Sequence, residues 1–222
     1  MFHDRRAAGE LLARRLLPMA KSQPVVLALP RGGVPVAAAV AETLKAPLGL
    51  LHVRKIGAPT QPELAVAAIA DGETPRLAIN HRVAEELGIS EAYLKEAGAR
   101  ELKEIERRKL RYEGGHPGPG VKGRSVILVD DGIATGATVR AALLALRASA
   151  PAGIVLAIPV APQSAIDQVA DLVDEVVCLE IPARFMAVGE FYVNFQQVSD
   201  GEVEALMRDA RQRMQSSTPA RR

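Results

Sequence analysis

Short apolar runs recur along the chain, and most are followed by a turn and then by a segment whose apolar residues have helical spacing. The runs predict strands at 25–29, 48–56, 125–129, 154–160 and 175–181. Turns that contain glycine or proline separate these strands from the helical segments. Because the strands are apolar on both faces and alternate with helices, the pattern predicts an α/β fold with a mostly parallel sheet flanked by helices on both faces.

Amphipathic and alanine-rich segments account for much of the remaining chain. They predict helices at 4–17, 34–44, 90–112 and 162–172. Asp4 is a candidate N-cap of the first helix, which we expect to pack on the sheet. Glycine and proline residues indicate a loop at 57–63, and the apolar segments 63–72 and 75–80 indicate a pair of short strands.

The charge balance argues against a strongly charged partner. The 28 lysine and arginine residues nearly match the 26 aspartate and glutamate residues, and a net charge of +2 is too small to indicate a nucleic-acid or membrane surface. A single cysteine, Cys178, excludes a disulfide framework or a cysteine-based metal site. No signal-peptide pattern is present, and no apolar stretch approaches the ~18 residues of a membrane span. We therefore expect a soluble, cytoplasmic protein that acts on a small molecule.

One segment combines features of a phosphate site and a sugar site. In VILVDDGIATGAT (126–138), four apolar residues precede Asp130, Asp131 and a glycine- and threonine-rich turn into a helix. Amides and hydroxyls at a helix N-terminus form an anion cradle. The lysine of a nucleotide-binding P-loop and the glycines of a dinucleotide-binding turn are both missing. Adjacent carboxylates would repel a phosphate but accept hydrogen bonds from a vicinal diol, or reach Mg²⁺ through water. Together these features predict a ribose 5-phosphate site.

The same segment resembles the phosphoribosyl diphosphate (PRPP) signature of the type I phosphoribosyltransferases. The resemblance implies that Asp130 and Asp131 bind the ribose hydroxyls. It also implies that the 5-phosphate is held by Ala134, Thr135, Gly136, Ala137 and Thr138. Without the resemblance, the segment would also fit a capped helix with two solvated acids.

A second segment, VVLALPRGG, resembles the pyrophosphate loop of this family. The resemblance implies that exposed amides and one basic residue hold the diphosphate, and it assigns this role to Pro30, Arg31, Gly32 and Gly33. In some relatives this turn contains a non-proline cis peptide, which glycine at position 32 would tolerate. Taken alone, PRGG is equally typical of an ordinary turn.

Two further resemblances concern the acceptor side and a lid. In VRKIGAPTQPE, Lys55 resembles one residue of the basic pair that precedes the mobile catalytic loop of orotate-type members. The resemblance makes Lys55 a candidate for contacting diphosphate. It also makes residues 57–63 the candidate for a lid that closes over PRPP. A solvated strand end is the alternative. The segment IPARFMAVGEFYVNF (181–195) loosely resembles the base-stacking stretch of hypoxanthine-guanine enzymes, which implies Phe185 and Val188 as base-binding residues. Core packing of its aromatic residues is the alternative.

The resemblance implies a Mg²⁺-dependent transferase that moves the 5-phosphoribosyl group from PRPP to a nitrogen nucleophile such as a nucleobase, with Mg²⁺ as cofactor and a homodimer as the common assembly. Ala134 stands where hypoxanthine-type members carry an aspartate, which puts 6-oxopurine salvage in doubt. The alternative function is a PRPP-sensing regulator that binds nucleic acid without turnover. Its surface would be the basic cluster Arg107, Arg108, Lys109, Arg111, Lys122 and Arg124. Glutamates interleaved with this cluster make nucleic acid an unfavoured partner.

The family's architecture also sets the expected domain organisation. We expect a single domain over 1–215 with its core at about 22–180 and a helical insertion at about 85–115. The N-terminal helix and residues 181–215 are expected to form a small hood over the site, and residues 216–222 a disordered tail.

Overall fold

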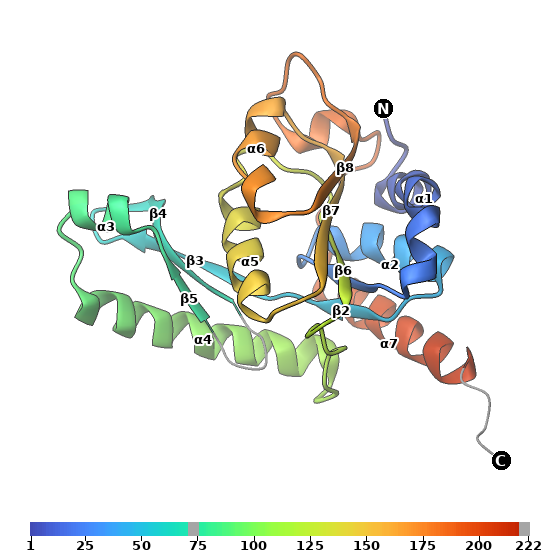
Figure 1. Cartoon of the computed structure of the whole chain (residues 1–222), viewed down its shortest axis with the longest axis horizontal. Coiled ribbons are helices and arrows are strands. Elements are labelled where there is room, and N and C mark those ends of the chain that lie inside the picture. Colours follow the sequence, from blue (N-terminus) through green and yellow to red (C-terminus); the bar gives the residue numbers. More distant parts are fainter. Residues whose placement is uncertain (71–75, 218–222) are drawn as a thin grey trace.

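A central sheet of five parallel strands organises the molecule. The computed structural model describes residues 1–70 and 76–217. The strand order is β2-β1-β6-β7-β8 (Figure 1). The strands are β1 (Val25–Ala28), β2 (Leu48–Leu50), β6 (Ser125–Val129), β7 (Gly153–Val160) and β8 (Glu175–Glu180). The predicted parallel sheet is therefore confirmed.

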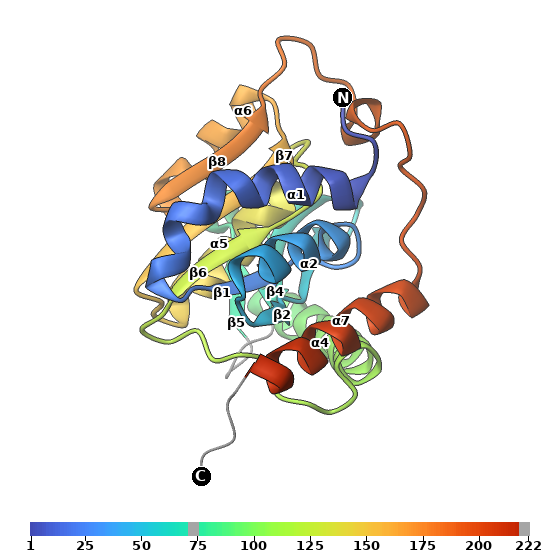
Figure 2. The same ribbon diagram turned by 90° about the vertical axis from the view of Figure 1, so that its right-hand side faces the viewer.

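Helices cover both faces of this sheet, as Figures 1 and 2 show. One side carries α1 (Arg5–Leu16), α2 (Gly33–Leu44) and α7 (Asp200–Ser217), and the other carries α5 (Ala137–Ala148) and α6 (Gln163–Asp167). Successive side chains of a strand point to opposite faces. Val26 and Ile127 accordingly pack in the core beneath α2, while Leu27 and Leu128 pack in the core beneath α5. Short 3-10 helices are η1 (Leu17–Ser22), η2 (Ala170–Leu172) and η3 (Val188–Phe191).

The first helix begins as predicted, but it packs chiefly on another helix. The amide of Ala7 donates a 2.8 Å hydrogen bond to Asp4 Oδ1, which confirms Asp4 as the N-cap. α1 packs mainly against α2 and also reaches β7 and β8. Gly9 permits this close crossing, because a Cβ there would lie 2.9 Å from the Cβ of Ala39.

A second, antiparallel sheet projects from the body as an arm (Figure 1). It contains β3 (Val53–Ala58), β4 (Gln61–Ala70) and β5 (Arg76–Ile79), in that order across the sheet. Two helices follow it, α3 (His81–Glu86) and α4 (Glu91–Glu113). Ile56 and Val66 of the sheet pack against Leu94 and Ala97 of α4. We use the word arm for residues 53–113.

The structure corrects the sequence prediction in this region. The single strand predicted at 48–56 is two strands of different sheets, because the chain leaves the parallel sheet at Leu51 and His52. The loop predicted at 57–63 is wrong, since only positions 59 and 60 form the turn between β3 and β4. Antiparallel pairing uses the backbone groups of this breaker-rich segment, and a register shift at Gly57 accommodates it. Residues 71–75, which include the ends of the two predicted short strands, lie outside the described residues.

The C-terminal region contains a helix that the sequence pattern did not predict. α7 runs to Ser217, so the first two residues of the predicted tail are helical, while 218–222 lie outside the described residues. The helix predicted at 162–172 is shorter, because α6 ends at Asp167 and η2 follows. None of the helices within residues 1–70 and 76–217 has the length and apolar character needed to cross a membrane.

Candidate active site

Parallel pairing of β1 and β6 brings the two predicted phosphate-binding turns together. Ala28 lies opposite Val129 at the carboxyl ends of these strands. One residue further, the amide of Leu29 donates a 3.0 Å hydrogen bond to the carbonyl of Val129. The turn at 30–33 therefore starts beside Asp130. This edge is where α/β sheets bind their ligands.

Glycine is required where the two turns touch. A Cβ at Gly32 would overlap the carboxylate of Asp131. A Cβ at Gly33 would lie 2.8 Å from the carbonyl oxygen of Val129 and 2.9 Å from the Cα of Asp130. The peptide bond between Pro30 and Arg31 is cis, as the family resemblance suggested. Residues about 100 positions apart thus form one continuous surface, on which the predicted diphosphate loop lies next to the predicted ribose-binding acids.

The two aspartates are held in a poorly solvated position. The amide of Asp131 donates a 2.9 Å hydrogen bond to Asp130 Oδ1, which orients that carboxylate. Burial raises the pKa of Asp130 well above its usual value, and the adjacent charge of Asp131 adds to the rise. Burial also raises the pKa of Asp131, although an arginine opposes the effect. A ligand that supplies hydrogen-bond donors or positive charge would stabilise the ionised form of these buried acids.

Arg5 is a site residue that the sequence reasoning missed. Its Nε donates a 2.7 Å hydrogen bond to Asp131 Oδ2, and the two side chains are only 11% and 14% exposed. A second nitrogen, Nη1, donates to the carbonyl of Gln196 at 2.7 Å, and the guanidinium lies 3.8 Å from the ring centre of Phe195. Arg5 therefore links the N-terminal helix, the second acid and the C-terminal segment. Its partner is 126 residues away, so no local pattern could reveal the pair.

Aromatic residues of 181–195 close the same side of the site. Tyr192 donates a 2.6 Å hydrogen bond from its hydroxyl to the carbonyl of Asp131, and burial raises the pKa of this tyrosine. The amide of Phe2 donates to the carbonyl of Phe191 at 2.7 Å, and the amide of Val193 donates to the carbonyl of Phe2 at 2.8 Å. These bonds join the N-terminus to the segment expected to form the hood.

The turn after the acids has the properties of an anion cradle. α5 begins at Ala137, its N-cap is Gly136 at φ 77°, and no side chain caps its first amides. The left-handed conformation of Gly136 favours glycine. Ala134, Thr135 and Thr138 are exposed, so their amides and hydroxyls are accessible to a ligand at the positive end of α5. Residues 134–138 thus lie at an uncapped helix N-terminus, and phosphate binding there stays a prediction.

Arg31 reaches away from the turn to the start of α7. Its Nη1 lies 3.3 Å from Asp200 Oδ1, and about a third of the side chain is exposed. Asp200 also accepts a 2.6 Å hydrogen bond from the hydroxyl of Tyr112 and pairs with Arg111. Sequence reasoning did not find Asp200, because α7 was not predicted. Arg31 needs to exchange this carboxylate for diphosphate oxygens in order to act as predicted.

Comparisons with known proteins show which family the chain belongs to. The family described as phosphoribosyl transferase domain matches residues 3–196. The chain belongs to this phosphoribosyl transferase family. Two curated sequences of Mycobacterium tuberculosis, from strains CDC 1551 and H37Rv, carry names that describe candidate phosphoribosyl transferases. Each is 45% identical over 207 residues, which cover 93% of this chain and 46% of the relative. The chain therefore spans about half the length of the curated relatives it matches.

The similarity extends to a solved structure. The protein TT1426 of Thermus thermophilus is 41% identical to this chain, and the two structures align with a TM-score of 0.84. The alignment covers 94% of this chain and 98% of that chain. The fold predicted from the sequence, a parallel sheet with helices on both faces, is therefore the phosphoribosyl transferase fold.

The remaining predicted site residues lie in two places, the segment 181–195 and the arm. Val188 lies against the segment 126–138, since a Cβ at Gly132 would come within 2.6 Å of Val188 Cγ1. Phe185 stacks on Phe191 with ring centres 5.6 Å apart, at the edge of the apolar cluster that contains Phe2 and Tyr192. Lys55, by contrast, is exposed on β3, opposite Ala68 of β4. The structure therefore brings Val188 to the phosphoribosyl transferase motif but places Lys55 in the second sheet.

Proposed function

We propose that this chain is a Mg²⁺-dependent phosphoribosyltransferase that transfers the 5-phosphoribosyl group from PRPP to a nitrogen nucleophile and releases diphosphate. One observation carries the proposal: the contact of Gly32 and Gly33 with Asp130 and Asp131, beside the uncapped N-terminus of α5. These groups match the three parts of PRPP, with one turn for the diphosphate, two acids for the ribose and a cradle for the 5-phosphate.

Each group acts on a different part of the substrate. Asp130 and Asp131 accept hydrogen bonds from the ribose hydroxyls and fix the sugar. The amides and hydroxyls of 134–138 hold its phosphate. The amides of the 30–33 turn, together with Arg31, stabilise charge on the departing diphosphate. Displacement at C1 develops oxocarbenium-like charge on the sugar, so orientation of the ring and the leaving group provides much of the rate enhancement.

Arg5 gives the site an internal counter-ion. Its guanidinium pairs with Asp131 before any ribose binds. When a diol binds, Asp131 can share its oxygens between the sugar and Arg5, because a carboxylate has about four acceptor positions. The pairing opposes the effect of burial and favours the ionised form of Asp131, which is the better hydrogen-bond acceptor for ribose.

The residues of the site fit Mg²⁺ that arrives with its substrate. Within residues 1–70 and 76–217, no group of three or more histidine, cysteine, aspartate or glutamate side chains could hold a metal ion. Mg²⁺ commonly binds through substrate phosphates, waters and one or two carboxylates. Asp130 and Asp131 can supply the carboxylates. The ion would neutralise charge on the diphosphate.

The acceptor is proposed to be a nucleobase-like molecule that enters between the cradle and the hood, beside Val188 and Phe185. Ala134 cannot act as a proton carrier, so we do not propose 6-oxopurine salvage. A homodimer, implied by the family resemblance, and a cytoplasmic location, expected from the sequence, belong to the same proposal.

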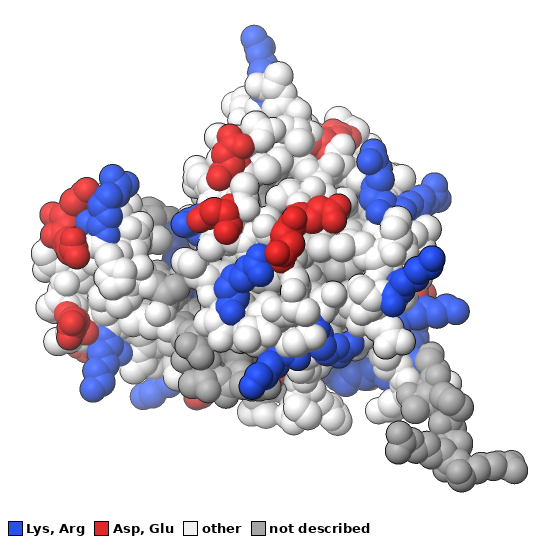
Figure 3. Space-filling view, in the orientation of Figure 1, with Lys and Arg blue, Asp and Glu red and all other residues white. Residues whose placement is uncertain are grey.

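Nucleic-acid binding receives little support from the surface. Arg107 and Arg108 both pair with Glu104, at 2.8 and 2.7 Å, and Arg111 pairs with Glu204 at 2.8 Å. Figure 3 shows both acidic and basic side chains on the displayed face, with Lys and Arg more frequent along its lower and right-hand edges. A regulatory role that depends on RNA or DNA is therefore not proposed.

Calorimetric titration of PRPP in the presence of Mg²⁺ tests the proposal. The double substitution Asp130→Asn and Asp131→Asn removes two charge-assisted acceptors, so we expect affinity to fall at least about 100-fold. Asp209→Asn, on the exposed side of α7, is the matched control and should bind as the wild type does. A screen of nucleobases and amines for diphosphate release then identifies the acceptor. Folded wild-type protein that binds no PRPP would overturn the proposal.

A further inference from the structure

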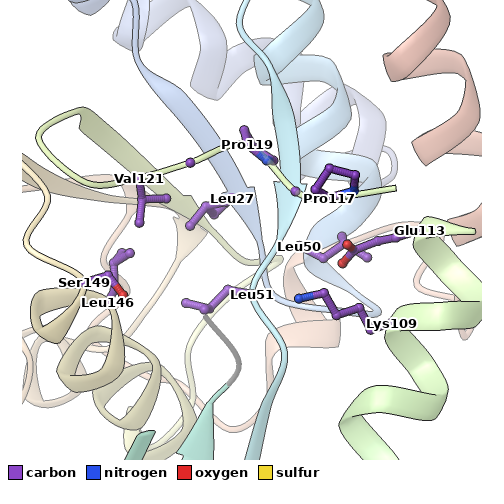
Figure 4. A pocket seen from close by; sticks show the side chains of 12 residues that line it. Leu27, Leu50, Leu51, Lys109, Glu113, Pro117, Pro119, Val121, Leu146 and Ser149 are labelled. Carbon is purple, nitrogen blue, oxygen red and sulfur yellow. The ribbon is translucent and has the colours of Figure 1, made fainter. Parts of the chain in front are cut away.

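A cavity of about 330 Å³ lies on the α5 side of the central sheet, away from the proposed PRPP site. Figure 4 shows its lining from β1, β2, the end of α4, the end of α5 and the loop 117–121. The walls are mainly apolar, with Leu27, Leu51, Val121 and Leu146 facing the space. None of the lining residues belongs to the 30–33 turn, the acid pair or the cradle. Leu146 and Ser149, near the C-terminal end of α5, place the cavity at the end of that helix opposite to the cradle.

Two ionisable residues, Lys109 and Glu113, belong to this mainly apolar lining, and Glu113 is the buried one. Glu113, at the end of α4, is only 4% exposed, and Figure 4 shows its carboxyl group directed toward the space between Leu50 and Pro117. Its Oε1 lies 3.1 Å from Nε2 of His52, which is 2% exposed. Its Oε2 has no hydrogen-bond partner, and it is the only such buried side-chain atom in the part of the chain that the structure describes. Buried carboxyl oxygens are almost always satisfied, so an unsatisfied one calls for an explanation.

The surrounding structure holds this oxygen in place. The ring of His52 stacks on Tyr112, with centres 6.1 Å apart and planes 16° apart. The loop that covers the oxygen packs closely on β2, because a Cβ at Gly49 would lie 2.6 Å from Cδ of Pro119. A Cβ at Gly118 would still be 4.0 Å from Glu113 Oε2. The loop therefore closes the wall without supplying a donor to the carboxyl group.

We propose that this cavity is a second small-molecule site, and that its ligand is a flat, largely apolar molecule with an edge of N–H donors, such as an amidine or an amino-substituted heterocycle. A carboxylate oxygen accepts hydrogen bonds, so a ligand that satisfies Oε2 of Glu113 must offer a donor. The apolar walls would contact the ring of the ligand. The Oε2 atom of Glu113 would orient the ring by accepting hydrogen bonds from its N–H edge. The volume lies within the usual range of roughly 300–1,000 Å³ for ligand pockets, and apolar walls with few polar groups are their common composition.

Benzamidine is a suitable probe, because it joins an apolar ring to a bidentate N–H edge. Benzoate is the matched control, since it has the same shape but offers only acceptors and a negative charge. We expect methyl resonances of Leu27, Leu51 and Leu146 to shift on titration with benzamidine and to remain unchanged with benzoate. Shifts confined to other parts of the protein, or an absence of shifts at millimolar benzamidine, would overturn the proposal.

Two substitutions test the chemistry of the site. Glu113→Gln keeps the size of the side chain but loses the charge-assisted acceptor, so benzamidine affinity should fall about tenfold or more. Val121→Phe fills the cavity from the loop side and should abolish binding while Glu113 is intact. Glu106→Gln, an exposed change on the same helix, is the control and should leave binding unchanged.

Folding and site occupancy are separated by running thermal unfolding on each variant. If Glu113→Gln does not fold, Val121→Phe and the methyl map still decide the question. Benzamidine binding that survives in both folded variants would place the probe elsewhere and refute the site. Since none of these measurements uses PRPP, the outcome is independent of the proposed transferase activity.

Discussion

The central sheet and the arm are built from similar apolar segments, yet they position functional residues differently. In the central sheet, parallel pairing of β1 and β6 requires their carboxyl ends to share an edge, so Gly33 and Asp130 meet. In the arm, β3 and β4 pair in opposite directions, and Lys55 lies opposite Ala68 instead of the acids. Parallel topology thus predicts which loops meet, whereas an antiparallel hairpin positions residues through its own register and its packing on helices.

Glycine replacement is the strongest way to test this difference. Gly33→Ala should destabilise the protein by about 1–3 kcal/mol, because the added Cβ meets backbone atoms that cannot move independently. Gly98→Ala, in the arm, places its Cβ 3.6 Å from Leu77 Cδ1, an ordinary contact within α4. It should therefore stabilise the protein by roughly 0.5–1 kcal/mol. Urea unfolding of both variants measures the two effects.

PRPP affinity provides the matching functional measurement. Gly33→Ala should lose PRPP binding together with stability, and Gly98→Ala should keep it. Equal effects of the two replacements would show that the close approach of the two turns has no special role.

The same contrast explains what the sequence could and could not predict. Four apolar residues before Asp130 indicate a buried strand, and a Gly/Thr-rich turn after it indicates a helix start, so this part of the site follows from local pattern. Arg5 and Asp200 could not be predicted, because their roles depend on partners at sequence separations of 126 and 169 residues. The hairpin was misread because its glycine and proline residues resemble a loop, and the pairing that orders them is tertiary.

A smaller effect should come from the arm itself. If Lys55 reaches diphosphate when substrate binds, Lys55→Ala should lower kcat/KM for diphosphate release about tenfold, the effect of one lost charge contact, with less change in the Kd of PRPP. Lys103→Ala, exposed on α4, is the charge-matched control. Unchanged kcat/KM in Lys55→Ala would restrict the arm to a structural role and confine catalysis to the central sheet.

The smallest expected effect concerns the two ends of the central sheet, where aspartates have opposite pKa shifts. Burial raises the pKa of Asp130 above the unfolded value of 3.8. The free energy of unfolding therefore decreases as pH rises above the unfolded pKa toward neutrality, because the buried acid must then ionise. Below the unfolded pKa Asp130 is protonated in both states and causes no destabilisation. Asp130→Asn should make the protein more stable at pH 7 by roughly 0.5–2 kcal/mol, while PRPP binding is lost.

Asp174, at the start of β8, gives the reverse case. The amide of Ile154 donates a 2.6 Å hydrogen bond to its Oδ2 and lowers its pKa below 3.8. Asp174 therefore stabilises the fold above that pH, and the contribution disappears as pH falls through its lowered pKa. Asp174→Asn should reduce stability at pH 7, by less than Asp130→Asn increases it, because the carboxylate is 56% exposed. Denaturant unfolding from pH 3 to 7 compares the two variants. If both substitutions changed the free energy of unfolding in the same direction, Asp130 would not be destabilising in the absence of substrate. The proposed function expects that destabilisation, because it places Asp130 in a poorly solvated position for ribose binding.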